Sequence, residues 1–435
     1  MDNQPTPTEI ETTLKVLRLA AADVSRFDSL LEFKTLVAKV NRLARQRHGR
    51  EVKQQMQTAD WQTKTAALES RAARVAPEIP LVLHKSRHCY ICKTPYRVLD
   101  GLYHLLCADC ATFNLKKRRQ RCDLGGRVAL ITGGRIKIGF EIALKLLRDG
   151  ARVILTTRFP RDAEQRFMAQ ADCADWSAQL ELHGLDLRHL AAVQGFIAGL
   201  LECEPHLDIL INNAAQTISR PLDFFAHLLE SENTVLPSEL VRSPMQFFGG
   251  SLEVLPFAVG QLDADGQALD LRVSNSWVQK LDQVPTRDLL EVQVVNFIAP
   301  FMFCSQLKPL FERSPFASRF IVNVSAMEGQ FSRLSKGVHH PHSNAAKAAL
   351  NMLTRTSGAD YARSQIYMTA VDTGWITDEN PFPKATRMRQ KQSFVPPLDA
   401  VDGAARIYDP IASTLNQPNP PFFGVFLKDY KPYPW

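Results

Sequence analysis

Four cysteines are the residues of this chain whose spacing points most directly to chemistry. Cys89 and Cys92 form one C-x2-C pair, and after fourteen residues Cys107 and Cys110 form a second. Two such pairs can place four thiolates around one ion, the closed tetrahedron that zinc takes in structural sites. The alternative is a redox dithiol. Because the segment is too short to bury much core, we expect bound zinc to supply much of its folding free energy.

A basic run, LKKRRQR at 115–121, follows the cysteines directly. Residues 81–127 carry ten basic and three acidic side chains, whereas the whole chain has a net charge of +7. Such a run can bind nucleic acid, acidic lipid or an acidic protein, can direct nuclear import, or can be a solvated helix face. We expect any protein or nucleic-acid partner of this region to be acidic.

From residue 127 onward, short apolar runs alternate with helical patterns. RVALITGG ends in glycines, FEIALKLLRDGA follows with helical spacing, and RVILTTR is a second apolar run. A strand, a glycine turn and a helix in this order present backbone N–H groups to a phosphate. Further buried strands are expected within 207–215, 318–329 and 365–375. These elements predict an α/β fold with a Rossmann-like, doubly wound parallel sheet.

Two smaller parts are expected ahead of that sheet. Residues 1–80 carry apolar side chains at helical spacing and predict an α-helical region. This region could pack on the protein's own body or on a second copy, or it could be an arm that binds a partner. Residues 81–122 would form the zinc module with its basic linker, and 123–435 the sheet domain.

The sheet domain resembles the short-chain dehydrogenase/reductase superfamily, because seven motifs occur in the order and approximate spacing of that family. The motifs are TGGRIKIG (132–139), NNAA (212–215), VVNFIAPF (294–301), IVNVSAMEG (321–329), SNAAK (343–347), VDTGWIT (371–377) and FFGVFLKD (422–429). A segment of about 222–285 is longer than the family usually needs. It would lie at the substrate mouth, as a lid or as a partner surface.

The resemblance implies an NAD(P) cofactor. Lys137 stands where the family has its second turn glycine, so the backbone there must take a different path or the ammonium must reach the phosphates. After the second strand, Arg158 stands where an acidic residue is expected for NAD, and together with Arg135 of the glycine turn it would suit a 2′-phosphate, which favours NADP. The residues expected to bind the cofactor are Thr132, Gly133, Arg135, Lys137, Ile138, Gly139, Arg158, Asp186, Asn213, Lys347, Gly374 and Thr377.

The resemblance also locates a catalytic set, Asn296, Ser343 and Lys347, in which the family's tyrosine is replaced by Ser343 and its serine by Ala326. A serine hydroxyl is shorter than a phenol and far less acidic, so the usual carbonyl reduction is not expected. Another acid could replace the phenol, and the candidates are His339, His340 and His342.

Three functions therefore remain open. The protein could be an NADP-dependent oxidoreductase of a carbonyl or alkene substrate with reassigned proton chemistry. It could be a catalytically silent nucleotide-binding scaffold or redox sensor, that is, a pseudoenzyme. It could also be an interaction protein without a cofactor.

The composition suggests a cellular compartment for this protein, and the family resemblance suggests its oligomeric state. No window approaches the roughly 18 uninterrupted apolar residues of a membrane span, and no secretory pattern opens the chain. The eight cysteines do not form a disulfide framework and fit a reducing compartment. We therefore expect a cytoplasmic protein, or a nuclear one in a eukaryote. The resemblance implies a homodimer.

Overall fold

The computed structural model describes residues 4–73, 79–220, 222–232, 240–243, 261–263, 265–333, 335–377, 379–392, 395–417 and 420–435. The chain divides into two compact units. The first comprises 1–87 with 95–101, and the second comprises 88–94 with 102–435. The cysteine pairs thus belong to the second unit. The expected boundaries at residues 80 and 122 stay a prediction.

The first unit is helical, as expected, with one added hairpin. Thr6 and Glu9 form a capping box at the start of α1, and Pro7 occupies its first turn. Asp60 of the long helix α2 accepts hydrogen bonds from the backbone N–H groups of His84 and Lys85, at 2.6 and 3.1 Å. The elements are α1 (Pro7–Ala22), η1 (Val24–Phe27), α2 (Leu31–Ala73), β1 (Leu81–His88) and β2 (Pro95–Leu99).

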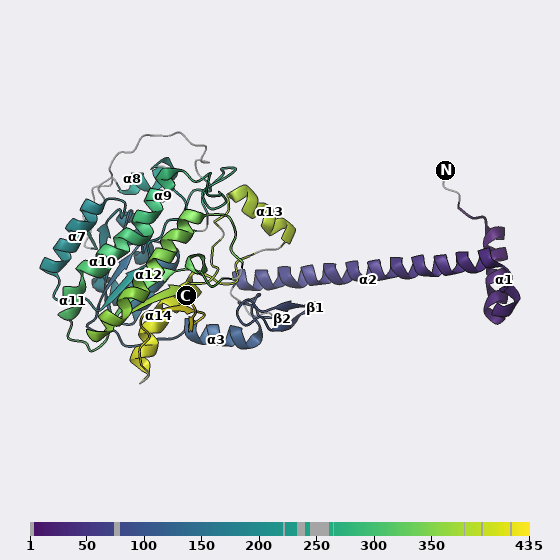
Figure 1. The fold of residues 1–435 in the computed structure, drawn as a ribbon, viewed down its shortest axis with the longest axis horizontal. Coiled ribbons are helices and arrows are strands. Elements are labelled where there is room, and N and C mark those ends of the chain that lie inside the picture. The colour runs from purple at the N-terminus through teal and green to yellow at the C-terminus, as the bar shows by residue number, and fades with distance from the viewer. Residues whose placement is uncertain are drawn as a thin grey trace. The chain divides into compact units, whose positions relative to one another are not determined.

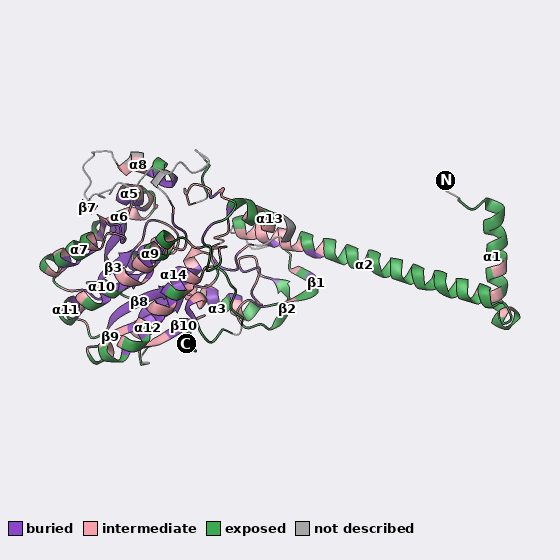
Figure 2. Ribbon diagram, turned by 45° about the horizontal axis from the view of Figure 1, so that its top comes forward, coloured by how far each residue is buried: buried purple, intermediate pink, exposed green. Residues whose placement is uncertain are grey.

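Most of this unit's helical surface is exposed, and α2 is drawn almost entirely in the exposed colour in Figure 2. Helix α1 has no buried residue, and the buried residues of α2 are Asp60 and Ala67. Ala67 packs with Leu83 and Leu99 of the hairpin. The hairpin therefore covers only the last part of α2.

The second unit is built on a nine-stranded sheet with the order β11-β10-β9-β8-β6-β3-β4-β5-β7. All neighbours are parallel except β10 and β11. The order reverses beside β3, which makes the sheet doubly wound and confirms the predicted fold class. The strands are β3 (Val128–Thr132), β4 (Arg152–Thr157), β5 (Leu180–Gly184), β6 (Ile209–Asn212), β7 (Val241–Ser243), β8 (Arg319–Ser325), β9 (Ile366–Asp372), β10 (Val425–Lys428) and β11 (Lys431–Tyr433).

Helices cover both faces of this sheet (Figure 1). One apolar layer joins the sheet to α4 (Lys137–Arg148), α5 (Pro160–Met168), α6 (Cys173–Trp176) and α14 (Ala400–Asn416). The other joins it to α7 (Leu190–Cys203), α10 (Ala299–Gln306), α11 (Lys308–Glu312) and α12 (Pro341–Arg363). The other helical elements are α3 (Ala108–Arg118), η2 (Ser177–Gln179), η3 (Leu222–Phe225), α8 (Ala226–Glu232), α9 (Thr286–Gln293), η4 (Val294–Ile298), η5 (Met327–Gly329) and α13 (Phe382–Gln392).

One helical stretch of the described chain, Thr286–Gln306, is long and apolar enough to cross a membrane by length and composition alone. It consists of α9, the π-helical turn η4 and α10. Val292, Ala299 and Phe303 are fully buried, and the last two belong to an apolar layer beneath the sheet. Part of this helix is therefore buried against the sheet.

The expected insertion at 222–285 is described in part. Phe224 and Phe225 are buried in a small cluster with Phe159 and Leu228, so its first aromatic residues face the body. The stretch MQFFGG at 245–250 lies outside the described residues.

Candidate functional site

The turn after β3 is closed by small residues and by one amide. A Cβ added to Gly139 would lie 2.1 Å from the carbonyl oxygen of Gly133, so helix α4 approaches this turn only because that side chain is missing. Asn213 donates from Nδ2 to the carbonyl oxygens of Thr132 and Gly133 at 3.1 and 2.8 Å. The Thr132 hydroxyl accepts from the N–H groups of Asn213 and Ala214 at 3.1 Å. Thr132 and Asn213 thus hold the turn against the end of β6.

Lys137 is the first residue of α4 and has φ +56°. This is the left-handed region that glycine enters without strain. Its Nζ lies 3.8 Å from Oδ2 of Asp265, and both side chains are partly exposed. The lysine therefore meets the turn with an unusual backbone path, one of the two outcomes expected for it.

A cavity of about 360 Å³ opens at the carboxyl ends of β3, β4 and β6. Its wall is formed by residues of the glycine turn, by Arg135 and Arg158, and by the loops after β5 and β6. Of the residues expected to bind a cofactor, Thr132, Gly374 and Lys347 do not line it. Those that do are Gly133, Arg135, Lys137, Ile138, Gly139, Arg158, Asp186, Asn213 and Thr377.

Three arginines line this cavity, Arg135, Arg158 and Arg220, and they differ in their partners. Arg135 donates from Nη1 to Oδ2 of Asp162 at 2.7 Å. Arg158 lies with its guanidinium 4.5 Å from the ring centre of Phe225 and 5.6 Å from that of Phe159. Within the described part of the chain Arg158 has neither a hydrogen bond nor an ion pair, and burial lowers its pKa to about 10. Arg158 and Arg220 thus both line the cavity without a carboxylate partner in the described residues, and Arg158 is the one that directly follows β4.

Asp186 lines the same cavity but is already engaged. Its carboxylate accepts from Nε of Arg188 at 2.9 and 3.0 Å and from the Arg188 backbone N–H at 3.0 Å. Burial alone would raise the pKa of Asp186, but the adjacent Arg188 holds it below its usual value. The negative charge of Asp186 is therefore already balanced by Arg188.

The expected catalytic residues lie beneath the cavity wall. Asn296, in the π-helical turn, accepts from the N–H of Gln216 at 2.7 Å and donates to its carbonyl oxygen at 2.8 Å. Lys347 donates from Nζ to the carbonyl oxygen of Val324 at 2.7 Å, and burial lowers its pKa to about 8. Ser343 is buried, and none of these three residues lines the cavity. Ser325, the serine next to Ala326, donates to Oδ1 of Asn351 at 2.6 Å.

The three histidines before Ser343 occupy different surroundings. The ring of His340 stacks on Trp277 at 4.0 Å, and its Nδ1 lies 2.9 Å from the Trp277 carbonyl oxygen. His339 is exposed. His342 is buried, with Nε2 3.2 Å from the carbonyl oxygen of Thr217, a residue that lines the cavity, and with no partner for Nδ1. Of the three, His342 is the one bonded to the cavity wall.

The four cysteines lie together, as their spacing predicts. All four sulfur atoms lie within 4.8 Å of one another, and those of Cys92 and Cys107 are 3.6 Å apart. Four thiolates around zinc at about 2.3 Å would have sulfur atoms roughly 3.8 Å apart, so the residues present fit that ion. Cys107 also occupies the N-cap position of α3, and the N-terminal end of a helix favours negative charge. Within the described residues no other group of His, Cys, Asp and Glu side chains meets the geometry of a metal site.

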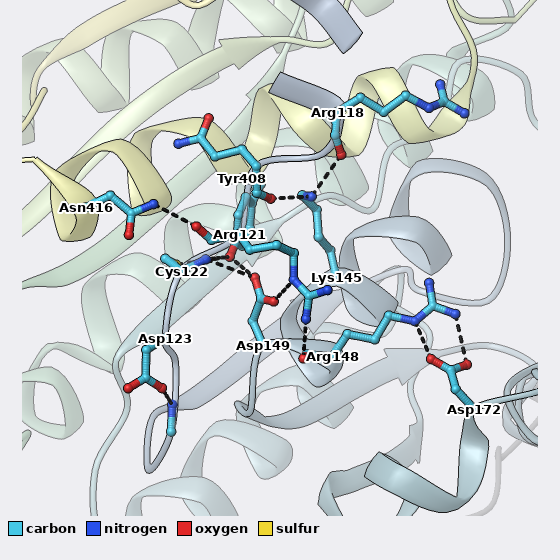
Figure 3. Close-up of polar contacts among 12 residues, drawn as sticks. Arg118, Arg121, Cys122, Asp123, Lys145, Arg148, Asp149, Asp172, Tyr408 and Asn416 are labelled. Carbon is cyan, nitrogen blue, oxygen red and sulfur yellow. Dashed lines mark hydrogen bonds and ion pairs between the residues drawn. The ribbon is translucent and has the colours of Figure 1, made fainter. Parts of the chain in front are cut away.

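Three cations of the basic run pair with carboxylates of the second unit, and Figure 3 shows one of these pairs, Arg121 with Asp149. Lys117 pairs with Asp409 of α14, Arg118 with Asp399 at 2.6 Å, and Arg121 with Asp149. These are three of the five cations in 115–121, and the other two, Lys116 and Arg119, are exposed. Most of the run's charge is therefore balanced within the chain, which the sequence alone did not indicate.

This sheet, its glycine turn and the cavity at the carboxyl ends of the strands define a nucleotide-binding fold of the oxidoreductase type. A family model described as short chain dehydrogenase matches residues 127–232 and 253–386, more than half of the chain. The protein therefore belongs to the short-chain dehydrogenase family, and the resemblance seen in its motifs is confirmed.

Individual relatives are similar over different extents. An uncharacterized protein of Acanthamoeba polyphaga mimivirus is 33% identical over 343 residues, which cover 75% of this chain and 71% of the viral protein. Dehydrogenase/reductase SDR family member 13 of Homo sapiens is 43% identical over 94 residues, 21% of this chain and 24% of that protein. The chain thus spans about a quarter of that human relative. NADPH-bound carbonyl reductase from chicken fatty liver covers 72% of this chain and 100% of its own at 20% identity, with a TM-score of 0.46.

Proposed function

We propose that the second unit binds NADP(H) in preference to NAD(H) and acts as an oxidoreductase whose proton chemistry does not use a tyrosine. Family membership supports the oxidoreductase class. The preference and the altered proton chemistry rest on residues of this chain.

The proposed preference for NADP(H) rests on the position and partners of Arg158. It follows β4, where an acidic residue would instead bind the ribose 2′-hydroxyl of NAD. Its guanidinium lies against two aromatic rings and has no carboxylate partner in the described chain. A half-buried cation without a counterion is unfavourable, and a 2′-phosphate would supply the missing charge with short, charge-assisted hydrogen bonds.

The phosphate end of the cofactor would lie at the glycine turn. Gly133 and Gly139 leave the backbone accessible there, and the N-terminal end of α4 favours an anion. The Lys137 ammonium adds a positive charge whose bond to Asp265 is long and partly exposed, so it is weak in water. When bound, NADPH supplies a hydride to an electron-poor carbon.

The proton side of the reaction follows from what replaces the phenol. Ser343 cannot act as an acid near neutral pH, and Ala326 has no hydroxyl to orient a carbonyl oxygen. The residues that remain, Asn296 and Lys347, bond to backbone carbonyl groups. We therefore infer an acceptor that needs little acid assistance, such as an activated alkene or an imine, with solvent or His342 as the proton source.

Calorimetric titration of the full chain with NADPH and NADH tests the cofactor proposal. We expect NADPH to bind in the micromolar range and at least ten times more tightly than NADH, as one charge-assisted contact allows. Failure of both to bind at millimolar concentration would reject it.

A second candidate function is a binding protein that holds NADP(H) without turnover. It is favoured by one observation: Asn296, Ser343 and Lys347 all lie outside the cavity lining. Incubation with NADPH and a panel of carbonyl, alkene and imine compounds separates the two. Oxidation of NADPH that depends on the added compound supports the enzyme, and its absence across the panel supports the silent scaffold.

We also infer that the four cysteines hold a structural zinc ion. Four sulfur ligands leave no open position for a substrate, so the ion would stabilise the fold around the cysteine pairs. Metal analysis of the purified chain should give one zinc per molecule, and a stably folded metal-free chain would contradict the inference.

A further inference from the structure

We propose that Tyr90, held between the two cysteines of the first pair, couples the zinc centre to the loop Thr373–Thr377 at the nucleotide cavity. This inference rests on the proposed function for its effect on cofactor affinity. Tyr90 would be a positioning residue, because it acts on the loop and does not itself line the cavity.

Tyr90 is fixed from its backbone to its hydroxyl. Its N–H donates to the carbonyl oxygen of Leu105 at 2.9 Å, which ties the first cysteine pair to the segment that leads into the second. The turn between Cys89 and Thr94 is closed by hydrogen bonds of 3.0 and 3.1 Å. Ligation of Cys89 and Cys92 to one ion would therefore set the direction of the Tyr90 ring.

The hydroxyl of Tyr90 bonds to the loop after β9. It accepts from the backbone N–H of Trp375 at 3.1 Å. The indole Nε1 of Trp375 in turn donates to the carbonyl oxygen of Thr377 at 3.0 Å, and Thr377 lines the cavity. Two hydrogen bonds thus connect the cysteine turn to the cavity wall.

The backbone of this loop is also restricted by steric contacts. Gly374 has φ +80°, and a Cβ there would lie 2.5 Å from Leu398. The backbone N–H of Leu398 donates to Trp375 at a long 3.3 Å. The bond from Tyr90 therefore restrains a short glycine-containing segment that has few alternatives.

The opposite side of the zinc centre is anchored to the rest of the second unit. The Tyr103 hydroxyl donates to Asp402 of α14 at 2.6 Å. Asn114 of α3, which follows the second cysteine pair, accepts from Arg406 at 2.9 Å. The residues around the zinc centre thus bond to α14 through Tyr103 and Asn114, and to the loop through Tyr90.

Hydrogen exchange of the loop amides tests the proposal directly. Tyr90→Phe keeps the ring and removes the acceptor, so we expect exchange across 373–377 to become about 3- to 10-fold faster, as loss of one hydrogen bond allows. Removal of zinc from the wild-type chain by a chelator should accelerate the same amides at least as much. The matched control is Tyr103→Phe, which removes the hydroxyl of a second tyrosine, one that bonds to Asp402 and not to the loop, and which should leave exchange in the loop unchanged.

Cofactor titration adds a second readout. Tyr90→Phe should weaken NADPH and NADH by the same factor of about 3 to 10, because the hydrogen bonds that start at Tyr90 lead to Trp375 and Thr377 and not to Arg158. The zinc content and melting temperature should stay those of the wild type.

Two results would overturn the proposal: equal loop exchange in the wild type and in Tyr90→Phe, or loop exchange that does not respond when zinc is removed. Exchange is measured without a cofactor. A wild-type chain that binds neither NADPH nor NADH would therefore count against the proposed function and leave this test valid.

Discussion

Lys347 keeps its place in the lysine helix of the family motif, but its ammonium bonds to a backbone carbonyl group. The Nζ–Val324 oxygen distance is 2.7 Å, and the side chain is buried. No carboxylate pairs with it in the described residues, so burial dominates and lowers its pKa to about 8. Lys347 is therefore a group whose charge costs folding free energy near neutral pH.

Stability above pH 8 should reveal this cost. A lysine in the unfolded chain titrates near 10.4, so between about pH 8 and 10 the unfolded chain binds more protons than the folded one. The free energy of unfolding should rise over that range by up to about 3 kcal/mol. In Lys347→Met the rise should be smaller by that amount, and what remains is expected from Lys145, whose pKa burial also lowers to about 8. Urea unfolding from pH 7.5 to 10 measures it.

Lys431→Met is the control for that experiment, because Lys431 is exposed. Its pH profile should follow the wild type. Parallel profiles for Lys347→Met and the wild type would show that Lys347 is not the group responsible.

At the scale of elements, the turn between β3 and α4 carries a strained residue. Lys137→Gly should raise the free energy of unfolding by about 0.5–1 kcal/mol, since glycine accepts the left-handed backbone without a steric cost. The same change should weaken NADPH binding, because it removes a cation from the phosphate end. Equilibrium unfolding and calorimetry measure the two effects.

Lys137→Ala separates charge from backbone. It removes the ammonium but keeps a Cβ, so NADPH should weaken as in the glycine variant without the gain in stability. A glycine variant that is no more stable than the alanine variant would contradict the strain at this position.

The segment after α3 is held by a second element-scale contact, centred on Asp149 at the end of α4. Asp149 is buried and accepts hydrogen bonds from Arg121, from the N–H of Cys122 and from the hydroxyl of Tyr408 (Figure 3). Asp149→Ala should lower the free energy of unfolding by about 3 kcal/mol, because it removes a buried charged acceptor from the hydroxyl of Tyr408, from the N–H of Cys122 and from the Arg121 guanidinium. Chemical denaturation measures the loss.

Asp172→Ala is the matched control for this contact. Asp172 pairs with Arg148 at 2.6 Å on the surface, so its loss should cost less than about 1 kcal/mol. Equal losses in the two variants would mean that burial does not set the strength of the Asp149 contact.

These elements also show how far sequence reasoning reaches. The glycine turn, the strands and the clustered cysteines were predicted because each depends on residues close in the chain. The partners of the cations were not, because Lys117 meets Asp409 and Arg118 meets Asp399 from nearly three hundred residues away. The sequence also did not indicate that Arg135, which lines the cavity as expected for a cofactor-binding residue, bonds to Asp162. The strands β7 and β11 are three residues each, too short for an alternating pattern to reveal.

At the scale of the whole molecule, the two units should differ in local stability. Amides of α1 and of the first thirty residues of α2 should exchange with solvent far faster than those of β3 and β8, since their side chains contribute almost nothing to a core. Hydrogen exchange read by mass spectrometry checks this. Protection of these helices equal to that of the sheet would mean that a second copy or a partner covers them in solution.

The central claim is that Arg158 recognises the phosphate that distinguishes NADP(H) from NAD(H). The most direct test compares the ratio of the Kd for NADH to that for NADPH in the wild type, in Arg158→Met and in Arg355→Met, which alters an exposed arginine of α12. The ratio should be about 10 or more in the wild type and in Arg355→Met, and should fall to about 1 in Arg158→Met. An undiminished preference for NADPH in Arg158→Met would contradict the account.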